Sequence, residues 1–236
     1  AEKLARAQAD TAKPLAALGA QDALVGIALL RGRLHEAERR FAQANEARIR
    51  VRGDSMNPYL AAQFHAMVDG QLRGDVPRGL AALDAAIRAT PPASVPVARD
   101  QSMWVAYAYS RLGATARARE VMSQHEARLD SVGRRQDAVF LVRTRGAIAL
   151  AEGKVDSAVA YFRRGDLEAD GLPTNQCSVC TPLFVGLAFD RGGQADSARV
   201  YLRKYVEMSG TTRTGIDRYY LAPTLYRLGE LYESAG

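Results

Sequence analysis

Glycines recur about every 40 residues, and this period constrains the fold more than any other feature of the chain. They are Gly32, Gly74, Gly113, Gly153, Gly193 and Gly236, separated by 42, 39, 40, 40 and 43 residues. A fixed period of this length is typical of repeat architectures, in which each copy is one supersecondary unit that packs against its neighbours. We therefore predict a single array over residues 1–236, with approximate copies 18–56, 57–96, 97–135, 136–175 and 176–215 and a partial copy at 216–236.

Side chains of fixed size keep fixed distances from these turn glycines. Five residues later the side chain is small, at Ala37, Gly79, Ala118, Ala158 and Ala198. Nine residues later it is large and apolar, at Phe41, Leu83, Met122, Phe162 and Leu202. Two helix axes approach to about 8–10 Å only where small residues meet. Each copy is therefore predicted to be two antiparallel helices joined at the glycine, and Gly146, Gly186 and Gly229, seven residues before a turn, fit the same crossing.

The composition favours helices. Hydrophobic residues make up 47% of the chain, led by Ala and Leu, and there are only nine prolines. Such a composition favours helix over strand. The longest apolar run, Ala23 to Leu30, has eight residues and is too short to cross a bilayer. We expect an all-α fold and no membrane insertion by this segment.

The pattern resembles the tetratricopeptide repeat. The small positions of that family match Gly146, Ala158, Gly186 and Ala198, its aromatic positions match Phe162, Phe189 and Tyr232, and its closing proline matches Pro91. The resemblance implies a right-handed α–α superhelix, a tetratricopeptide-like solenoid of about five and a half helix–turn–helix repeats, although the family period is about 34 residues rather than about 40. It also implies a concave groove lined by the first helices. The groove positions carried over are Gln71, Tyr107, Arg143, Asp190, Tyr226 and Glu230.

A narrower resemblance covers the segment from Gly146 to the end of the chain. It is similar to the repeat region that follows the kinase domain in many bacterial serine/threonine kinases, where such repeats are taken as sensor or docking modules. The chain has no Gly-rich nucleotide loop, no V-A-I-K lysine, no H-R-D and no D-F-G. We therefore expect no enzyme activity and no cofactor.

The two cysteines, Cys177 and Cys180, form the only strong chemical pair in the sequence. A zinc site would need two further ligands, and His35, His65 and His125 lie in other copies, so no metal is expected. Two readings remain open: a local disulfide before the fifth copy, or two free thiols. A disulfide would indicate an oxidising compartment, and on this ground we favour an extracytoplasmic (periplasmic) location over the cytoplasm.

The charged residues give no catalytic or nucleic-acid signature. The net charge is +6, and 28 of the 32 basic residues are arginine, scattered along the chain beside Asp and Glu. No basic block alternates with aromatic residues, as a nucleic-acid surface would require. His35 and His125 are expected to face solvent and His65 to be partly buried. Tyrosines gather near the C-terminus, and of these Tyr219 and Tyr220 are added to the interface candidates.

These patterns predict a non-catalytic scaffold that binds protein partners, as an accessory subunit of a larger complex. A membrane-associated, extracytoplasmic complex is one form that this assembly could take. The alternatives are the sensor or docking region of a kinase-like receptor and a helical array that binds nucleic acid. Because the sixth copy is only a half, we expect an apolar face on its helix that a partner or further chain covers.

Replacing Ala158 or Ala198 with leucine should lower the free energy of unfolding by about 1–3 kcal/mol, because the larger side chain overpacks a helix crossing. Thermal melting against the unsubstituted chain measures the effect. An unchanged melting temperature would show that these positions are exposed and that the predicted register is wrong.

Overall fold

A computed structural model describes residues 2–9, 14–52, 58–165, 177, 179–208 and 213–235. Within these ranges every regular element is a helix and no strand occurs, so the predicted all-α class is confirmed. None of the described helices is both long and apolar enough to cross a bilayer.

Each predicted complete copy contains one pair of helices. The pairs are α2 (Pro14–Leu30) with α3 (Leu34–Arg52), α4 (Leu60–His65) and the π-helix η1 (Ala66–Leu72) with α5 (Val76–Ala89), α6 (Ser102–Arg111) with α7 (Thr115–Arg128), α8 (Ser131–Ala151) with α9 (Val155–Arg164), and α10 (Cys180–Arg191) with α11 (Ala195–Glu207). The partial copy holds α12 (Arg213–Glu233). Two 3₁₀ turns, η2 (Pro92–Ser94) and η3 (Val97–Arg99), connect α5 to α6. The short helix α1 (Glu2–Ala9), which the period does not predict, packs on α2.

Five of the recurring glycines end the first helix of a pair in the left-handed backbone region. Gly32, Gly74, Gly113, Gly153 and Gly193 have φ between 68° and 77°. At Gly153 the amide donates to the carbonyl of Leu150, and the amide of Lys154 donates to the carbonyl of Ala149, which is the Schellman pattern of a helix end. A β-carbon disfavours this conformation, so the turn requires glycine. The turns lie where the glycine period places them.

Small residues occupy the crossings inside each pair. Ala37, Ala118, Ala158 and Ala198 have no exposed surface. A β-carbon on Gly146 would lie 2.6 Å from the ring of Phe162, and one on Gly186 would lie 2.6 Å from Leu202. Phe162 and Leu202, each nine positions after a turn glycine, therefore rest on the small residue of the preceding helix.

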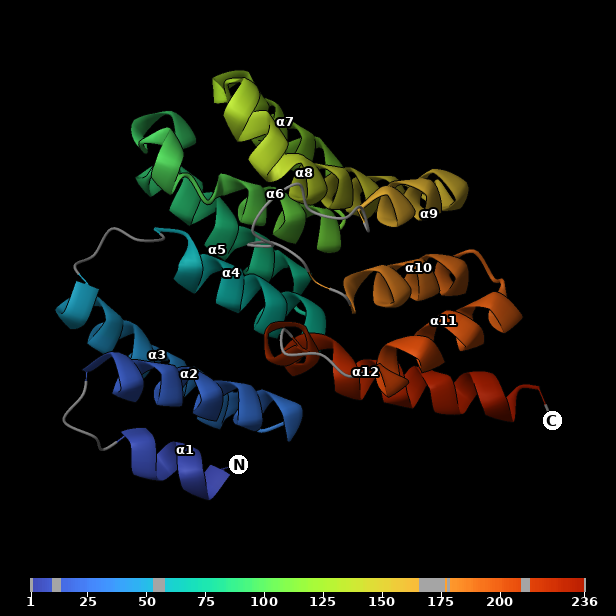
Figure 1. Cartoon of the computed structure of the whole chain (residues 1–236), viewed down its shortest axis with the longest axis horizontal. Coiled ribbons are helices and arrows are strands. Elements are labelled where there is room, and N and C mark those ends of the chain that lie inside the picture. Colours follow the sequence, from blue (N-terminus) through green and yellow to red (C-terminus); the bar gives the residue numbers. More distant parts are fainter. Residues whose placement is uncertain are drawn as a thin grey trace.

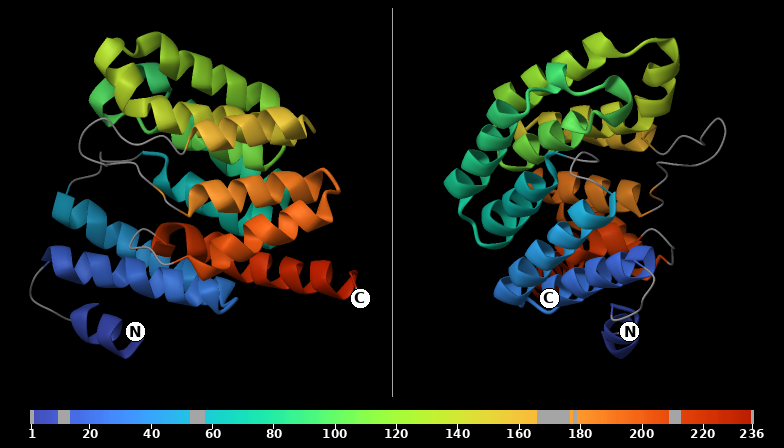
Figure 2. Two further views of the ribbon diagram at one scale, coloured as in Figure 1. Left: turned by 45° about the vertical axis from the view of Figure 1, so that its right-hand side comes forward. Right: turned by 90° about the vertical axis from the view of Figure 1, so that its left-hand side faces the viewer.

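The chain curls back on itself, so that its first and last hairpin elements meet. Figure 1 shows the pairs running from α2–α3 through α6–α7 to α8–α9, then returning through α10–α11 to α12. Helix α12 packs against both α11 and α2, and the turned view of Figure 2 also shows α12 alongside α2. One flank of the half copy is thus covered by the chain's own N-terminal hairpin rather than by a partner.

His125 corrects the expectation that it faces solvent. Its side chain on α7 is only 3% exposed, with Nδ1 3.1 Å from Asp100 and Nε2 2.8 Å from Asp137. Arg128 also pairs with Asp100. Burial alone would lower the pKa of His125, but the hydrogen bonds to the two carboxylates outweigh it and raise the pKa to about 9. His35, by contrast, is exposed as expected.

The free energy of unfolding should fall as the pH rises from about 6.5 to about 9. The folded pKa of His125 lies above the value of 6.5 in an unfolded chain. The charged imidazolium therefore stabilises fully below pH 6.5, and this contribution, on the order of 3 kcal/mol, is lost as the pH passes through the folded pKa. Denaturant unfolding measured across this range tests the effect.

The replacement His125→Asn should remove this fall, whereas His35→Asn, at the exposed histidine, should keep it. An identical pH dependence in the His125 variant and the unsubstituted chain would contradict the assignment.

Candidate functional site

Aromatic side chains from three first helices meet at the centre of the molecule. The hydroxyls of Tyr107 on α6 and Tyr220 on α12 lie 2.9 Å apart. The ring of Phe184 on α10 lies 6.0 Å from the Tyr107 ring and 5.8 Å from the Tyr220 ring, centroid to centroid. Burial raises the pKa of Tyr107 well above its usual range. This contact holds α12 against the other first helices.

Several predicted groove residues are consequently internal contacts of the chain. Tyr220 is only 6% exposed, and Tyr219 is partly buried on the same helix. Asp190 on α10 receives the guanidinium of Arg227 from α12, at 2.9–3.1 Å. Gln71 lies at the end of η1, beside Arg111. The predicted groove residues Gln71, Tyr107 and Asp190 do not line an open groove, because α12 lies across them. The interface candidates Tyr219 and Tyr220 belong to α12 itself and are at least partly buried.

Arg143 also differs from the expectation. Its side chain on α8 is 8% exposed, and Nη2 donates to the carbonyls of Gly165 at 3.0 Å and Cys177 at 3.5 Å. It therefore links α8 to the end of α9 and to the start of the fifth copy, instead of facing a partner.

Cys177 and Cys180 are joined by a disulfide in the structure, with their Cα atoms 5.2 Å apart. Cys180 begins α10, and its amide donates to the carbonyl of Cys177 at 3.0 Å. The bond closes one turn of chain immediately before this helix. Its place is structural, because Cys180 is buried in the core that α9, α10 and α11 share.

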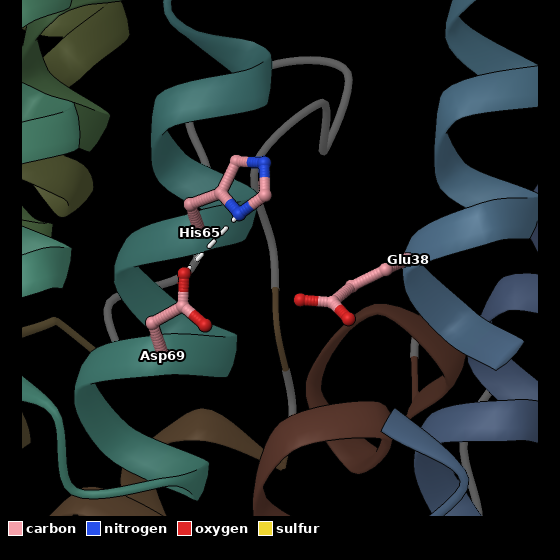
Figure 3. Close-up of side chains that lie close together, drawn as sticks. All are labelled: Glu38, His65 and Asp69. Atoms are coloured by element: carbon pink, nitrogen blue, oxygen red, sulfur yellow. Dashed lines mark hydrogen bonds and ion pairs between the residues drawn. The ribbon is translucent and has the colours of Figure 1, made fainter. Parts of the chain in front are cut away.

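Glu38, His65 and Asp69 form the one group of possible metal ligands found within the described ranges. One ligand atom from each lies within 4.8 Å of the others. Figure 3 shows His65 and Asp69 on one helical stretch, joined by a dashed line, with Glu38 reaching toward them from α3. His65 is partly exposed, and Asp69, in the π-helix, is 1% exposed. An unpaired carboxylate at that depth would be energetically unfavourable. The partners of Asp69 therefore decide whether this group could bind a metal ion or has a structural role.

Arginines already neutralise these carboxylates. Arg73 donates to Asp69 at 2.6 Å and, through Nη2, to Glu38 at 2.8 Å. Arg78 approaches Asp69 at 3.2 Å. The hydrogen bond from Arg73 is the main cause that lowers the pKa of Glu38 to about 2. A cation would have to displace this guanidinium, so we assign the cluster to pinning α3 against η1.

The outer face of α12 is the one predicted interface region that is exposed. The outer face consists of Ala222, Leu225, Tyr226, Gly229 and Tyr232, spaced by three or four residues along one side of the helix. Leu225 is 49% exposed, Tyr226 72% and Tyr232 48%. Glu230 borders this face and pairs with Arg227, which lowers the pKa of Glu230.

The equivalent positions on α10 are covered. The turn glycines at 193 and 236 are 43 residues apart, so each residue of the outer face corresponds to the residue 43 positions earlier on α10. These equivalents are Val179, Pro182, Leu183, Gly186 and Phe189. The first four are buried, and Phe189 packs on Tyr201 of α11 at 5.5 Å between ring centroids. Leu202 rests on Gly186, whereas a β-carbon on Gly229 would meet nothing within 4 Å. Among the described residues no second helix covers this face of α12 in the way that α11 covers α10.

No protein-family model, no curated protein and no solved structure matches the chain. The tetratricopeptide likeness therefore rests on the residues quoted for it, and the function has to be argued from the geometry.

Sequence reasoning did not find Arg111, whose guanidinium carbon lies 5.3 Å from the centre of the Tyr220 ring. The sequence did contain a clue to this residue: Arg111 and Arg191 both lie two residues before a turn glycine, at equivalent positions of two copies. The pairing of Arg73 with Glu38 left no signal, because it joins residues 35 positions apart that belong to two different copies.

The replacements Gly229→Ala and Gly186→Ala should have opposite effects on stability. The first should raise the free energy of unfolding by about 0.5–1 kcal/mol, because alanine favours helix and its β-carbon meets open space. The second should lower it by about 1–3 kcal/mol, because the β-carbon would overlap Leu202. Denaturant unfolding of both variants checks the pair. Equal losses of stability would show that the face around Gly229 is covered.

Proposed function

We propose that the chain is a non-catalytic protein-binding module that docks an amphipathic helix of a partner protein on the outer face of α12. The observation that carries the proposal is the open surface at Gly229, at a position where Gly186 receives Leu202. The apolar side chains around it are half exposed or more. Contiguous exposed apolar surface of this kind marks interaction sites.

The covered pair α10–α11 indicates what the partner helix looks like. A large apolar residue, in the role of Leu202, rests over Gly229. A small residue four positions earlier, in the role of Ala198, lets the helices approach. Glu233 borders the outer face and is exposed, so a basic residue at the matching end of the partner adds a favourable pair. This mode is helix-in-groove recognition, in which apolar side chains spaced by three or four residues along the partner helix make the main contacts.

The helix pairs also support a tetratricopeptide-like, right-handed solenoid, tightened until α12 meets α2. In this proposal the chain is an accessory subunit of a larger complex. The Cys177–Cys180 disulfide supports an oxidising, extracytoplasmic location. The docking region of a kinase-like receptor would use the same surface, with the partner helix supplied by the receptor or its target.

Nucleic-acid binding has less support, since many arginines are engaged by carboxylates. Arg73, Arg119 and Arg227, for example, each make ion pairs of 2.9 Å or less. Such pairs leave fewer cations for phosphate groups.

The proposal predicts that helical peptides selected from a displayed amphipathic library bind the full chain through Gly229. Gly229→Arg and Leu225→Asp should each weaken the selected peptides by at least about tenfold, because a buried leucine side chain contributes about 1.5–3 kcal/mol. Fluorescence polarisation with the labelled peptides measures the affinities, and melting curves verify that the variants fold.

Val132→Asp is the matched control, since Val132 on α8 is 48% exposed and lies outside the outer face. This variant should bind as the unsubstituted chain does. A library without binders, or binders indifferent to both substitutions on α12, would refute helix docking at this face.

A further inference from the structure

A cavity of about 620 Å³ lies where the ends of four first helices meet α12. Gln71 of η1, Leu112 after α6, Leu150 of α8 and Leu187 of α10 line it, together with Tyr220 and Thr224 of α12. Pockets that bind small organic molecules have volumes of roughly 300–1,000 Å³ and combine apolar walls with a few polar groups. The size and the lining of this cavity fit that class.

Arg111 brings a charge to the cavity that no described carboxylate balances. It is partly buried at the end of α6 and lines the cavity, and the described residues place no Asp or Glu within ion-pair distance. Its neighbours are neutral: the Tyr220 ring, and the amide of Gln71. With that amide turned so that its oxygen faces Arg111, the oxygen accepts from Nε at 2.7 Å and from Nη2 at 3.2 Å. A guanidinium removed from water without an anion is unfavourable, so an anion bound beside it would be strongly held.

Thr224 is an independent observation at the same cavity. Its side chain is 1% exposed, and Oγ1 has no hydrogen-bond partner among the described residues. Buried hydroxyls are normally paired, and unpaired ones call for an explanation. A ligand oxygen accepting from Thr224 Oγ1 would supply the missing partner.

The remaining charges around the cavity also favour an anion. Arg191 is exposed at the lining and makes no ion pair within the described ranges. Asp190 is engaged by Arg227. Two of the three lining arginines therefore carry a charge that the described chain does not neutralise.

We propose that this cavity binds a small organic anion, with a carboxylate or phosphate head on Arg111 and an apolar body against Leu112, Leu150 and Leu187. The guanidinium presents parallel donors that match both head groups. The site is separate from the outer face of α12, so it goes beyond helix docking and does not depend on it.

Two dyes of similar size test the proposal on the full chain. 8-Anilinonaphthalene-1-sulfonate is anionic, and N-phenyl-1-naphthylamine is its uncharged relative. Arg111→Met should weaken the anionic dye by at least about tenfold and leave the neutral dye within about twofold, because one charge-assisted hydrogen-bonded contact is lost while the apolar walls remain. Fluorescence titration gives both dissociation constants, and far-UV circular dichroism verifies the fold.

Controls separate the cavity from other surfaces. Arg135→Met, at an exposed arginine of α8, removes the same charge elsewhere and should change neither affinity. Leu225→Asp, on the outer face, should also change neither. Ala151→Trp, which fills the cavity from α8, should reduce binding of both dyes, and this variant carries the test if Arg111→Met does not fold.

Benzoate and phenyl phosphate should displace the anionic dye, and the stronger competitor identifies the head group. The proposal is overturned if neither competes, if Arg111→Met weakens both dyes equally, or if Ala151→Trp leaves both affinities unchanged.

Discussion

The fold depends on one contact that recurs along the chain: a bulky apolar side chain of a second helix rests on a glycine or alanine of the first. Phe162 on Gly146 and Leu202 on Gly186 show it at its closest, since a single added β-carbon would come within 2.6 Å of the large side chain. Packing that tight leaves little freedom in the crossing, because interiors are filled to crystal-like density. The turn glycines set the length of each pair, and the crossings set how the pairs stack.

Closure depends on a second kind of contact, made only once in the described chain. Tyr107 and Tyr220 share a hydrogen bond across 113 residues, with Phe184 packed against both rings. Buried tyrosines need such partners for their hydroxyls, and these two tyrosines supply each other. The result turns an array that could stay open into one whose last helix lies against its first pair. It also places α12 across what would have been a groove.

The repeat could be predicted from the sequence because it is local, and the closure could not. Turn glycines, small crossing residues and large partners all lie within one copy, so their spacing is visible in the sequence and the structure places them accordingly. Tyr220 was misread as an interface residue and Arg143 as a groove residue because their surroundings come from other copies. His125 was misread for a different reason: Asp100, its buried partner, lies in the same copy but 25 residues away, in a stretch without helical periodicity. Tyr226 was predicted to line the groove, and its side chain is 72% exposed, because no described element crosses its side of α12.

Helix α12 separates two surfaces by its own periodicity. Tyr220 and Thr224 are four residues apart and face the centre, whereas Leu225 and Gly229, also four apart, face outward. A long helix that packs against α2 and α11 along its flanks holds both sides at fixed orientation. The inner side presents an unpaired hydroxyl beside an unbalanced guanidinium, and the outer side presents apolar rings beside an open glycine. These features fit the two proposed ligands, a small anion and an apolar helix face, and their separation on α12 means that a change on one side need not disturb the other.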